Sequence, residues 1–239
     1  MSNSEPLELE IGMASGHLIR GLKDAVPVML GFVPFALVLG AQAVQKGFSP
    51  VEVSLMTGLN FGGGSEFAAL ALWTSPPHVA LIVAITLLVN SRHLLMGAAL
   101  APLMRGLSRR KAFLVLFLMC DESWAMGLDD ARRNRTSLNT GYFFGVAIGL
   151  YLSWIVFTTV GAVVGPVVGD VTRYGFDMAF PAVFLFILAG MWKGVAASRP
   201  WLVSLVVAGA THIFVPGAWY VPAGALSGVL SAYLLARPK

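Results

Sequence analysis

Apolar stretches long enough to cross a lipid bilayer follow one another along nearly the whole chain. A membrane-spanning helix needs roughly 20 predominantly apolar residues, with a range of about 17–25. The segments that approach or reach this length are Val26–Val44, Val53–Trp73, Val79–Leu103, Ala112–Gly127, Gly141–Val168, Met178–Ala196, Trp201–Gly217 and Ala218–Leu235. Only 12% of the residues are charged, against about 25% in soluble domains, which is too few to cover a water-exposed surface. The sequence therefore predicts an all-α, polytopic transmembrane helix bundle with six to eight membrane segments.

Little of the chain is left for an aqueous domain. Residues 1–20 contain Glu5, Glu8 and Glu10 and no early basic run, so they do not resemble a cleaved signal peptide and are expected to form an N-terminal cytoplasmic tail. Residues 21–239 are expected to form a single transmembrane domain. The lone Cys120 excludes an internal disulfide and a CxxC metal site. The basic residues cluster in loops without interleaved aromatics, so the expected surroundings are the lipid bilayer and not nucleic acid.

The positions of the basic residues favour two segments that enter the membrane and return. Cytoplasmic loops are enriched in Lys and Arg. If all eight segments cross, the basic loop 105–111 lies on the face opposite Arg20. If segments 53–73 and 112–127 instead dip in and return, the sixteen basic residues lie inside, except for Lys46, Arg92 and Arg173. We therefore expect six full spans, two broken or re-entrant hairpins, and a cytoplasmic N-terminus.

Two pairs of short stretches indicate a possible internal repeat. Asp24–Pro27 resembles Asp177–Pro181, and Gly62–Phe67 resembles Gly209–Phe214. Both aspartates are expected near helix starts, where an acidic side chain stabilises the helix dipole. Transporters are often built from such repeats, with broken helices in matching positions. Chance similarity of short stretches is the alternative.

Three consecutive glycines interrupt the second apolar segment near its middle. They are Gly62, Gly63 and Gly64. Each weakens a helix by roughly 1 kcal/mol relative to alanine, so we expect the backbone to unwind there and the helix to restart near Ser65. The N–H groups of the restarted helix could bind a substrate carboxylate. The polar flanks Asn60 and Glu66 favour such a substrate-binding site over the alternative, close helix packing through small residues.

Ionisable side chains also interrupt the apolar segments. A charge at the bilayer centre costs about 2.5–3.5 kcal/mol on insertion scales, so it is expected to face a cavity or a partner. Glu66 could exchange a coupling proton, bind a substrate ammonium group, or form a static ion pair with Arg92. Arg92, next to the candidate substrate ligand Asn90, could grip a carboxylate bidentately or clamp carbonyls of a broken helix. His93 could relay a proton or only pack between helices.

Two adjacent carboxylates, Asp121 and Glu122, are further candidates for proton coupling. On a helix they point about 100° apart, so at most one faces a given cavity. They lie at the tip of the segment if it is re-entrant; the alternative is exposure at the cytoplasmic edge. His212 is expected to be a packing histidine. The sequence has no P-loop, GxSxG or HExxH motif, and its four scattered histidines support no metal site, so neither enzymatic activity nor a cofactor is expected.

Several of these stretches resemble, in order and spacing, the AzlC family, the large subunits of two-component branched-chain amino-acid exporters. The matching residues are Gly31–Phe35 with Gly40, Asn60–Ala69, Asn90–Gly97, Asp121–Ala125, Trp154 with Thr158 and Gly161, and Gly175–Phe180. The resemblance extends from about Gly21 to the C-terminus. One departure concerns Glu66, because that position is usually glutamine in the family.

The resemblance implies a secondary transporter of the bacterial cell inner membrane, an antiporter that exports branched-chain or other small apolar amino acids, coupled to a proton gradient. It also implies a small hydrophobic partner subunit of the AzlD type. The alternative is a membrane scaffold or channel-like subunit whose partner carries transport. An intramembrane hydrolase is disfavoured because no nucleophile–base pair is apparent.

Overall fold

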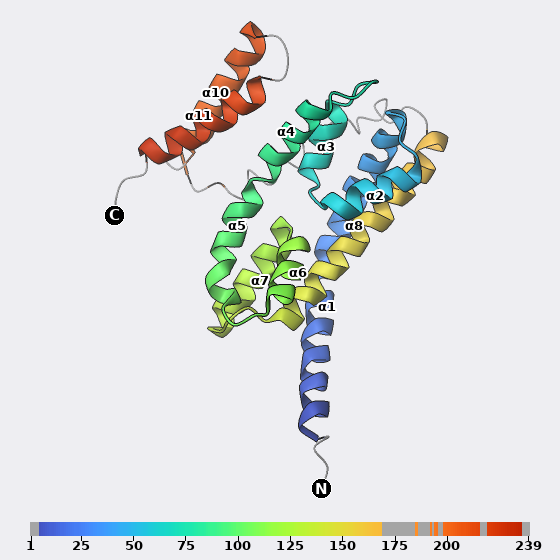
Figure 1. Ribbon diagram of the computed structural model, residues 1–239, viewed down its shortest axis with the longest axis vertical. Helices are drawn as coiled ribbons and strands as arrows, with labels where there is room; N and C mark the ends of the chain where they lie inside the picture. Colours follow the sequence, from blue (N-terminus) through green and yellow to red (C-terminus); the bar gives the residue numbers. More distant parts are fainter. Residues whose placement is uncertain are drawn as a thin grey trace. The chain divides into compact units, whose positions relative to one another are not determined.

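The computed structural model describes residues 5–168, 198–215 and 219–235, together with residues 185, 192, 194 and 195. The described chain is helical and contains no strand (Figure 1), which confirms the predicted all-α class. It divides into two units, Met1–Ala179 and Phe180–Lys239. Asp177, the Gly175–Phe180 stretch and nearly all of the expected span Met178–Ala196 lie outside the described residues.

Two long helices form the centre of the first unit. Helices α1 (Glu5–Gln45) and α8 (Thr140–Val168) pack along much of their length and run parallel. Glycines allow this approach: a Cβ on Gly21 would lie 2.2 Å from the carbonyl oxygen of Tyr142, and a Cβ on Gly40 would lie 1.9 Å from that of Thr158. Small residues at membrane helix interfaces let backbones come this close. Ser15–Gln45 and Thr140–Val167 are each long and apolar enough to cross a membrane.

The start of α1 differs from the sequence prediction. The helix begins at Glu5, well before the predicted apolar segment Val26–Val44. Asp24 therefore lies inside the helix, and its expected position at a helix start is wrong. The assignment of residues 1–20 to a cytoplasmic tail stays a prediction. The helix also passes Pro27 and Pro34 without ending; a proline removes one intrahelical hydrogen bond, but membrane helices tolerate it where neighbouring groups satisfy the freed carbonyl.

The second apolar segment is broken and returns to its starting point. Helix α2 (Pro50–Asn60) starts with a capping box between Ser49 and Glu52, whose hydrogen bonds lower the pKa of the Glu52 carboxyl. Helix α3 (Gly64–Ala71) follows the break. The ring of Trp73, just after α3, lies 4.5 Å from that of Phe48, just after α1. Both ends of the segment therefore lie at the same end of α1, as expected for a re-entrant hairpin.

The third apolar segment is a single long run with an interruption. Helix α4 (Val79–Asn90) is followed, across Ser91, by α5 (Arg92–Leu100) and the short 3-10 helix η1 (Ala101–Met104). The whole run Val79–Met104 is long enough to cross a membrane. Near its end, Leu103 accepts a hydrogen bond of 3.0 Å from the backbone N–H of Leu138, which precedes α8. The run therefore ends where α8 begins and is antiparallel to it.

The fourth apolar segment also breaks into two short helices. Helices α6 (Arg109–Phe117) and α7 (Asp121–Asn134) pack around one buried apolar cluster, to which the end of α5 and the start of α8 also contribute. Leu107, before α6, packs on the same cluster as Leu138, after α7. Eight simple spans would put Leu103 and Leu138 on opposite faces of the membrane, whereas their hydrogen bond puts them at the same end. This is the geometry expected for two re-entrant hairpins.

The second unit contains an antiparallel helix pair, α10 (Arg199–Phe214) and α11 (Tyr220–Leu235). The Ser204 hydroxyl donates to the Gly224 carbonyl at 2.8 Å. The ring of His212 packs edge-on against Tyr220 at 5.1 Å, as expected of a packing histidine. The stretch Gly209–Phe214 is uninterrupted helix, unlike the broken stretch Gly62–Phe67. The two stretches therefore differ in structure, because Gly209–Phe214 has a single glycine where Gly62–Phe67 has three; the internal repeat stays a prediction.

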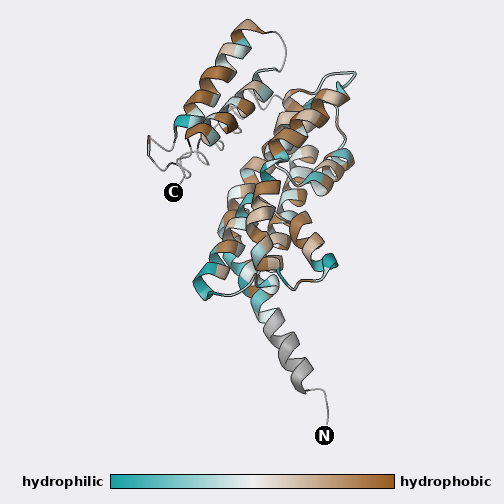
Figure 2. Ribbon diagram, turned by 60° about the vertical axis from the view of Figure 1, so that its left-hand side comes forward, coloured by the Kyte–Doolittle hydropathy of each residue, from teal (hydrophilic) through white to brown (hydrophobic). Residues whose placement is uncertain are grey.

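Hydrophobic residues predominate along most of the helices (Figure 2), and many of the large ones are exposed. Large exposed examples are Leu59, Leu94, Val167, Leu205 and Leu226. Exposed apolar surface of this extent requires a lipid environment, which agrees with the predicted transmembrane bundle.

Candidate functional site

The tips of both hairpins meet at Tyr151, in the middle of α8. Its hydroxyl donates a 2.6 Å hydrogen bond to the carbonyl of Gly58, in the last turns of α2. Its ring lies 5.1 Å from Phe61, in the first break, and 6.2 Å from Phe117, at the end of α6. The breaks are thus gathered at one depth of the bundle, although they are far apart in sequence.

The glycine break is shaped by polar neighbours. Helix α2 ends at Asn60, and the positive φ angles of Phe61 (φ 44°) and Gly63 (φ 48°) turn the chain before α3 begins at Gly64. A Cβ on Gly62 would lie 2.3 Å from the Ser65 hydroxyl and 2.8 and 2.9 Å from the amides of Asn60 and Asn90, respectively. The predicted unwinding is confirmed, and at Gly62 the requirement comes from polar contacts and not from apolar helix packing.

Glu66 is buried at this break, with 1% of its surface exposed. One carboxylate oxygen accepts from the indole Nε1 of Trp154 at 2.9 Å. The other accepts from the backbone N–H of Gly62 at 3.1 Å and from the amide of Asn60 at 3.4 Å. The side chain therefore occupies a backbone donor of the break itself, the N–H of Gly62.

Asn60 and Asn90 join the two broken segments. The Asn60 Nδ2 donates to the Ser65 hydroxyl at 2.8 Å, and its Oδ1 accepts from the Nδ2 of Asn90 at 3.0 Å. The backbone carbonyl of Asn90 in turn contacts the Nδ1 of His93 at 3.1 Å. The glycine break and the Asn90–His93 break are therefore in direct contact.

Arg92 pairs with Asp121 and not with Glu66. Its Nη1 lies 2.9 Å from Asp121 Oδ2, and the two side chains are 34% and 37% exposed. Its Nη2 donates to the Gly62 carbonyl at 3.4 Å. The static Glu66–Arg92 ion pair considered from the sequence is therefore wrong. The arginine instead links all three breaks, and the suggested clamp on a broken-helix carbonyl is found.

Asp121 and Glu122 begin α7, directly after the break at Leu118–Cys120. The Ser123 hydroxyl accepts from the N–H of Cys120 at 2.9 Å and caps this start. A helix N-terminus favours both negative charges. Asp121 pairs with Arg92 at the hairpin tip, and among the described contacts only one of the two adjacent carboxylates meets Arg92, as expected from their divergence on a helix.

Sequence reasoning missed the partners that α8 supplies. Helix α8 carries Tyr151, Trp154 and Thr158 along one apolar span. The first two donate hydrogen bonds to the first hairpin, and the Thr158 hydroxyl lies 3.1 Å from that of Thr57. Polar groups on Trp, Tyr and Thr in an apolar helix usually find a partner when buried. That signal was available, but the identity of each partner depends on contacts between segments distant in the chain.

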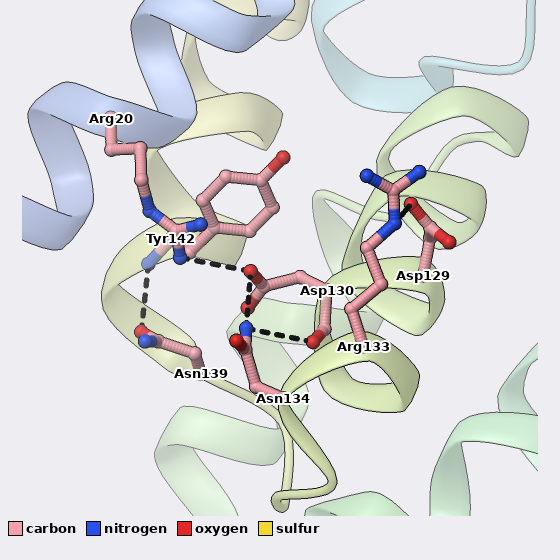
Figure 3. A network of polar contacts seen from close by, with 7 residues as sticks. All are labelled: Arg20, Asp129, Asp130, Arg133, Asn134, Asn139 and Tyr142. Carbon is pink, nitrogen blue, oxygen red and sulfur yellow. Dashed lines mark hydrogen bonds and ion pairs between the residues drawn. The ribbon is translucent and has the colours of Figure 1, made fainter.

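A second polar cluster joins α1, α7 and the start of α8 (Figure 3). The guanidinium of Arg20 lies 2.9 Å from Asp130 Oδ1 and 4.3 Å from the ring centre of Tyr142. Asn134 donates to both the carbonyl and the carboxylate of Asp130, at 2.9 and 3.0 Å. Asn139 accepts from the backbone N–H of Tyr142. The cluster fixes α7, and so Asp121 at its other end, to the two long helices.

Within the parts of the chain that are described, no group of three or more His, Cys, Asp or Glu side chains could hold a metal ion. The three helix breaks meet at one place, called the junction. Its polar residues offer hydrogen-bond donors, hydrogen-bond acceptors and one ion pair. These groups can bind a zwitterion or exchange a proton.

Known proteins of similar sequence are membrane proteins. The inner membrane protein YgaZ of Escherichia coli is 26% identical over 229 residues, which cover 93% of this chain and 92% of YgaZ. The branched-chain amino acid transport protein AzlC of Bacillus subtilis is 30% identical over 173 residues, covering 70% of this chain and 65% of that protein. A membrane protein of Archaeoglobus fulgidus is 28% identical over 177 residues, 73% of this chain and 76% of its own.

No solved structure matches the chain. The family model described as AzlC protein matches residues 27–168, which include the C-terminal part of α1, helices α2 to α7 with all three helix breaks, and the whole of α8. That match covers more than half of the sequence, so the chain belongs to the AzlC family.

Proposed function

We propose that the protein is a secondary transporter that exports branched-chain or other small apolar amino acids. It does so in exchange for protons, together with a small hydrophobic subunit of the AzlD type, across an inner membrane with its N-terminus in the cytoplasm. Membership of the AzlC family and the name of the Bacillus subtilis relative support the substrate class. The partner subunit, the proton coupling and the orientation belong to the proposal.

The observation that carries the proposal is the polar junction where three helix breaks meet. Glu66, Arg92 and Asp121 lie within apolar segments, where each charge costs about 2.5–3.5 kcal/mol. Backbone breaks at membrane depth are tolerated only beside protein or a polar cavity. A chain that only needed to be anchored would need neither. Transporters place substrate sites at broken helices of this kind.

Arg92 is the group best suited to the substrate carboxylate. A guanidinium can bind a carboxylate through two parallel hydrogen bonds, and Arg92 Nε is buried without a hydrogen-bond partner among the described residues. Its partner Asp121 is about one-third exposed, so a substrate can compete for it. The freed Asp121, or Glu66, then meets the substrate ammonium group. Phe61, Phe117 and Tyr151 border the junction and would receive an aliphatic side chain.

Proton coupling is assigned to the carboxylates and to His93. Glu66 is the buried one, held by three donors, whereas Asp121 and Glu122 lie at the start of α7. His93 contacts the Asn90 carbonyl with one ring nitrogen, which leaves the other for a proton relay.

The proposal is tested by intracellular leucine, isoleucine and valine in cells fed the corresponding dipeptides, with and without this chain and its small partner. Export should lower the intracellular pool, and Arg92→Ala should abolish the effect. Arg133→Ala is the matched control, since Arg133 forms an exposed pair with Asp129 far along α7. Normal export by a correctly inserted Arg92→Ala protein would contradict the assignment of the site.

Reconstitution in liposomes distinguishes the proposed transporter from the alternative, a scaffold whose partner carries transport. We expect leucine flux in liposomes that contain the chain and its partner, and loss of that flux with Arg92→Ala. Equal flux with the partner alone would assign transport to the partner and make this chain a scaffold.

A further inference from the structure

Two asparagine amides connect Glu66 to the break between α4 and α5. Asn60 Nδ2 points to Glu66 Oε1 at 3.4 Å and to the Ser65 hydroxyl at 2.8 Å. Asn60 Oδ1 accepts from Asn90 Nδ2 at 3.0 Å. The NH₂ group of Asn60 therefore faces Glu66, and the NH₂ group of Asn90 faces Asn60. A negative carboxylate requires this orientation, because it only accepts hydrogen bonds.

The remaining partners of Glu66 cannot reverse. The indole Nε1–H of Trp154 and the backbone N–H of Gly62, at 2.9 and 3.1 Å, are donors only. They hold the carboxyl group in place whatever its charge. The two asparagines differ, because a half-turn of the terminal amide exchanges its oxygen and nitrogen at little cost in torsional energy. The Ser65 hydroxyl can donate or accept and so follows either arrangement.

When Glu66 is protonated, the oxygen of the Asn60 amide is favoured next to the carboxyl group in place of its NH₂ group. A proton taken from the aqueous phase onto Oε1 faces the NH₂ of Asn60, and two donors then meet. A half-turn of Asn60 places its oxygen opposite the new O–H. Its NH₂ then faces Asn90, which must also turn to present its oxygen. No covalent bond other than the new O–H is made or broken.

The chain of amides ends at the side of Asn90 that faces away from Asn60, called its far side. In the observed arrangement Asn90 Oδ1 is buried and has no hydrogen-bond partner among the described residues. After reversal, the NH₂ group occupies that position. The two arrangements thus offer an acceptor or a donor at the same point, two residues before Arg92, the proposed ligand of the substrate carboxylate.

We propose that Asn60 and Asn90 form an amide relay, through which protonation of Glu66 changes the far side of Asn90 from an acceptor for the substrate ammonium group into a donor that repels it. The relay rests on the proposed function for the identity of its ligand. With Glu66 ionised the ammonium group is bound, and with Glu66 protonated it is released. One proton is thereby exchanged for one substrate, as antiport requires.

Few other charges adjoin the relay. Residues 25–45 of α1, all of α4 and all of α8 contain no Asp, Glu, Lys, Arg or His, and Glu52 of α2 is engaged at its capping box. The nearest charged or titratable groups of the adjoining elements are Arg92 and His93 on α5, Asp121 and Glu122 at the start of α7, and Tyr151 on α8, whose hydroxyl is bonded to the Gly58 carbonyl. The other charged residues of α7 lie towards its opposite end: Asp129, Asp130, Arg132 and Arg133. Arg92 contacts the Gly62 carbonyl and Asp121, and His93 contacts the Asn90 carbonyl. None of them is hydrogen-bonded to the Asn60 or Asn90 amide groups.

The relay is tested first without substrate, by solid-state NMR of the chain and its partner in lipid bilayers, labelled in the asparagine side-chain amides and glutamate carboxyls. The chain has five asparagines: Asn3, Asn60, Asn90, Asn134 and Asn139. We expect the Asn60 and Asn90 amide signals to shift together as the Glu66 carboxyl signal titrates, and to stay fixed in Glu66→Gln. Asn134 and Asn139 serve as internal controls. A Glu66 signal that titrates while Asn90 stays fixed in the unmodified protein overturns the relay.

The second measurement is leucine binding to the same preparation as a function of pH. Below the pH at which Glu66 takes up its proton, the apparent affinity should fall about tenfold per pH unit, as linkage of one proton requires. Asn60→Ala should flatten this slope while the Glu66 signal still titrates. Ser54→Ala, which removes a hydroxyl of α2 bonded to Thr159, should keep it.

The two measurements separate the relay from the substrate. A slope unchanged in a folded Asn60→Ala protein overturns the relay even if leucine binds. No leucine binding at any pH, with the coupled asparagine shifts present, overturns the amino-acid substrate and supports the relay.

Discussion

The closest contact between the two long helices gives the sharpest test of the fold. A Cβ on Gly40 would lie 1.9 Å from the carbonyl oxygen of Thr158 and 2.6 Å from the backbone nitrogen of Ala162. Ordinary contact begins at 3.4 Å, so Gly40→Ala must separate α1 from α8 locally by about 1.5 Å, and a gap of even 0.5–1 Å forfeits a quarter to a half of the dispersion energy. The obstacle is backbone, which cannot turn aside as a side chain can.

Overpacking of a well-packed interior costs about 1–3 kcal/mol, and Gly40→Ala should fall at the upper end of this range. The matched control is Gly31→Ala on the same helix, where an added Cβ meets nothing within 4 Å. That substitution should be neutral or stabilise by about 0.5–1 kcal/mol through helix propensity. Because both variants gain the same propensity, their difference isolates the steric cost.

The assay is thermal unfolding of the purified protein in detergent, followed by loss of the monodisperse peak in size-exclusion chromatography. At roughly 2–4 °C for each kcal/mol in a chain of this size, Gly40→Ala should unfold several degrees below Gly31→Ala. Equal midpoints for the two variants would refute the close parallel packing of α1 on α8.

Three further outcomes are expected. A double-mutant cycle of Trp154→Phe and Glu66→Met, in which each single change removes the hydrogen bond, should give a coupling energy of about 1.5–3 kcal/mol, the range for a hydrogen bond to a charged group; additive effects would contradict the buried bond. Arg20→Met should destabilise the protein more than Arg20→Met combined with Asp130→Asn, because the single change leaves a buried carboxylate uncompensated; unfolding at equal or higher temperature than the double variant would contradict it. Ser108→Cys, in a chain without its native cysteine, should be labelled by an impermeant thiol reagent from the cytoplasmic side only; labelling from outside alone would restore eight simple spans.

Local chemistry predicted the helix breaks because their causes are local. Three successive glycines unwind the chain wherever it lies, and the positive φ of Gly63 shows why glycine is needed there. The basic loop 105–111 predicted the return of the second hairpin because charge orientation acts on each loop separately. The long span of α8 followed from its uninterrupted apolar run.

The pairing of the charges could not be predicted in the same way. Arg92 meets Asp121 because the break between α4 and α5 lies beside the tip of the second hairpin, and Glu66 meets Trp154 because α8 packs against the first break. Both contacts depend on packing between distant segments. The start of α1 was also missed, since a search for apolar stretches does not detect a polar helix that continues beyond one.

The polar groups of the junction have two duties that must be kept apart in any mutational study. Every broken helix leaves backbone groups that lipid cannot satisfy, and here functional side chains satisfy them. Arg92 donates to the Gly62 carbonyl, Glu66 accepts from the Gly62 N–H, and Tyr151 donates to the Gly58 carbonyl. Truncating Arg92 therefore removes a proposed substrate ligand and also exposes a backbone carbonyl.

The two effects are separated by a variant that retains only one of the duties. Arg92→Lys keeps a positive donor for Asp121 and the Gly62 carbonyl but loses the planar fork that binds a carboxylate in two places. If Arg92 is a substrate ligand, Arg92→Lys should unfold close to the unmodified protein yet bind leucine at least tenfold more weakly, the equivalent of about 1.4 kcal/mol. If its duty is structural alone, Arg92→Lys should bind leucine normally, and the loss of export in Arg92→Ala would then follow its loss of stability.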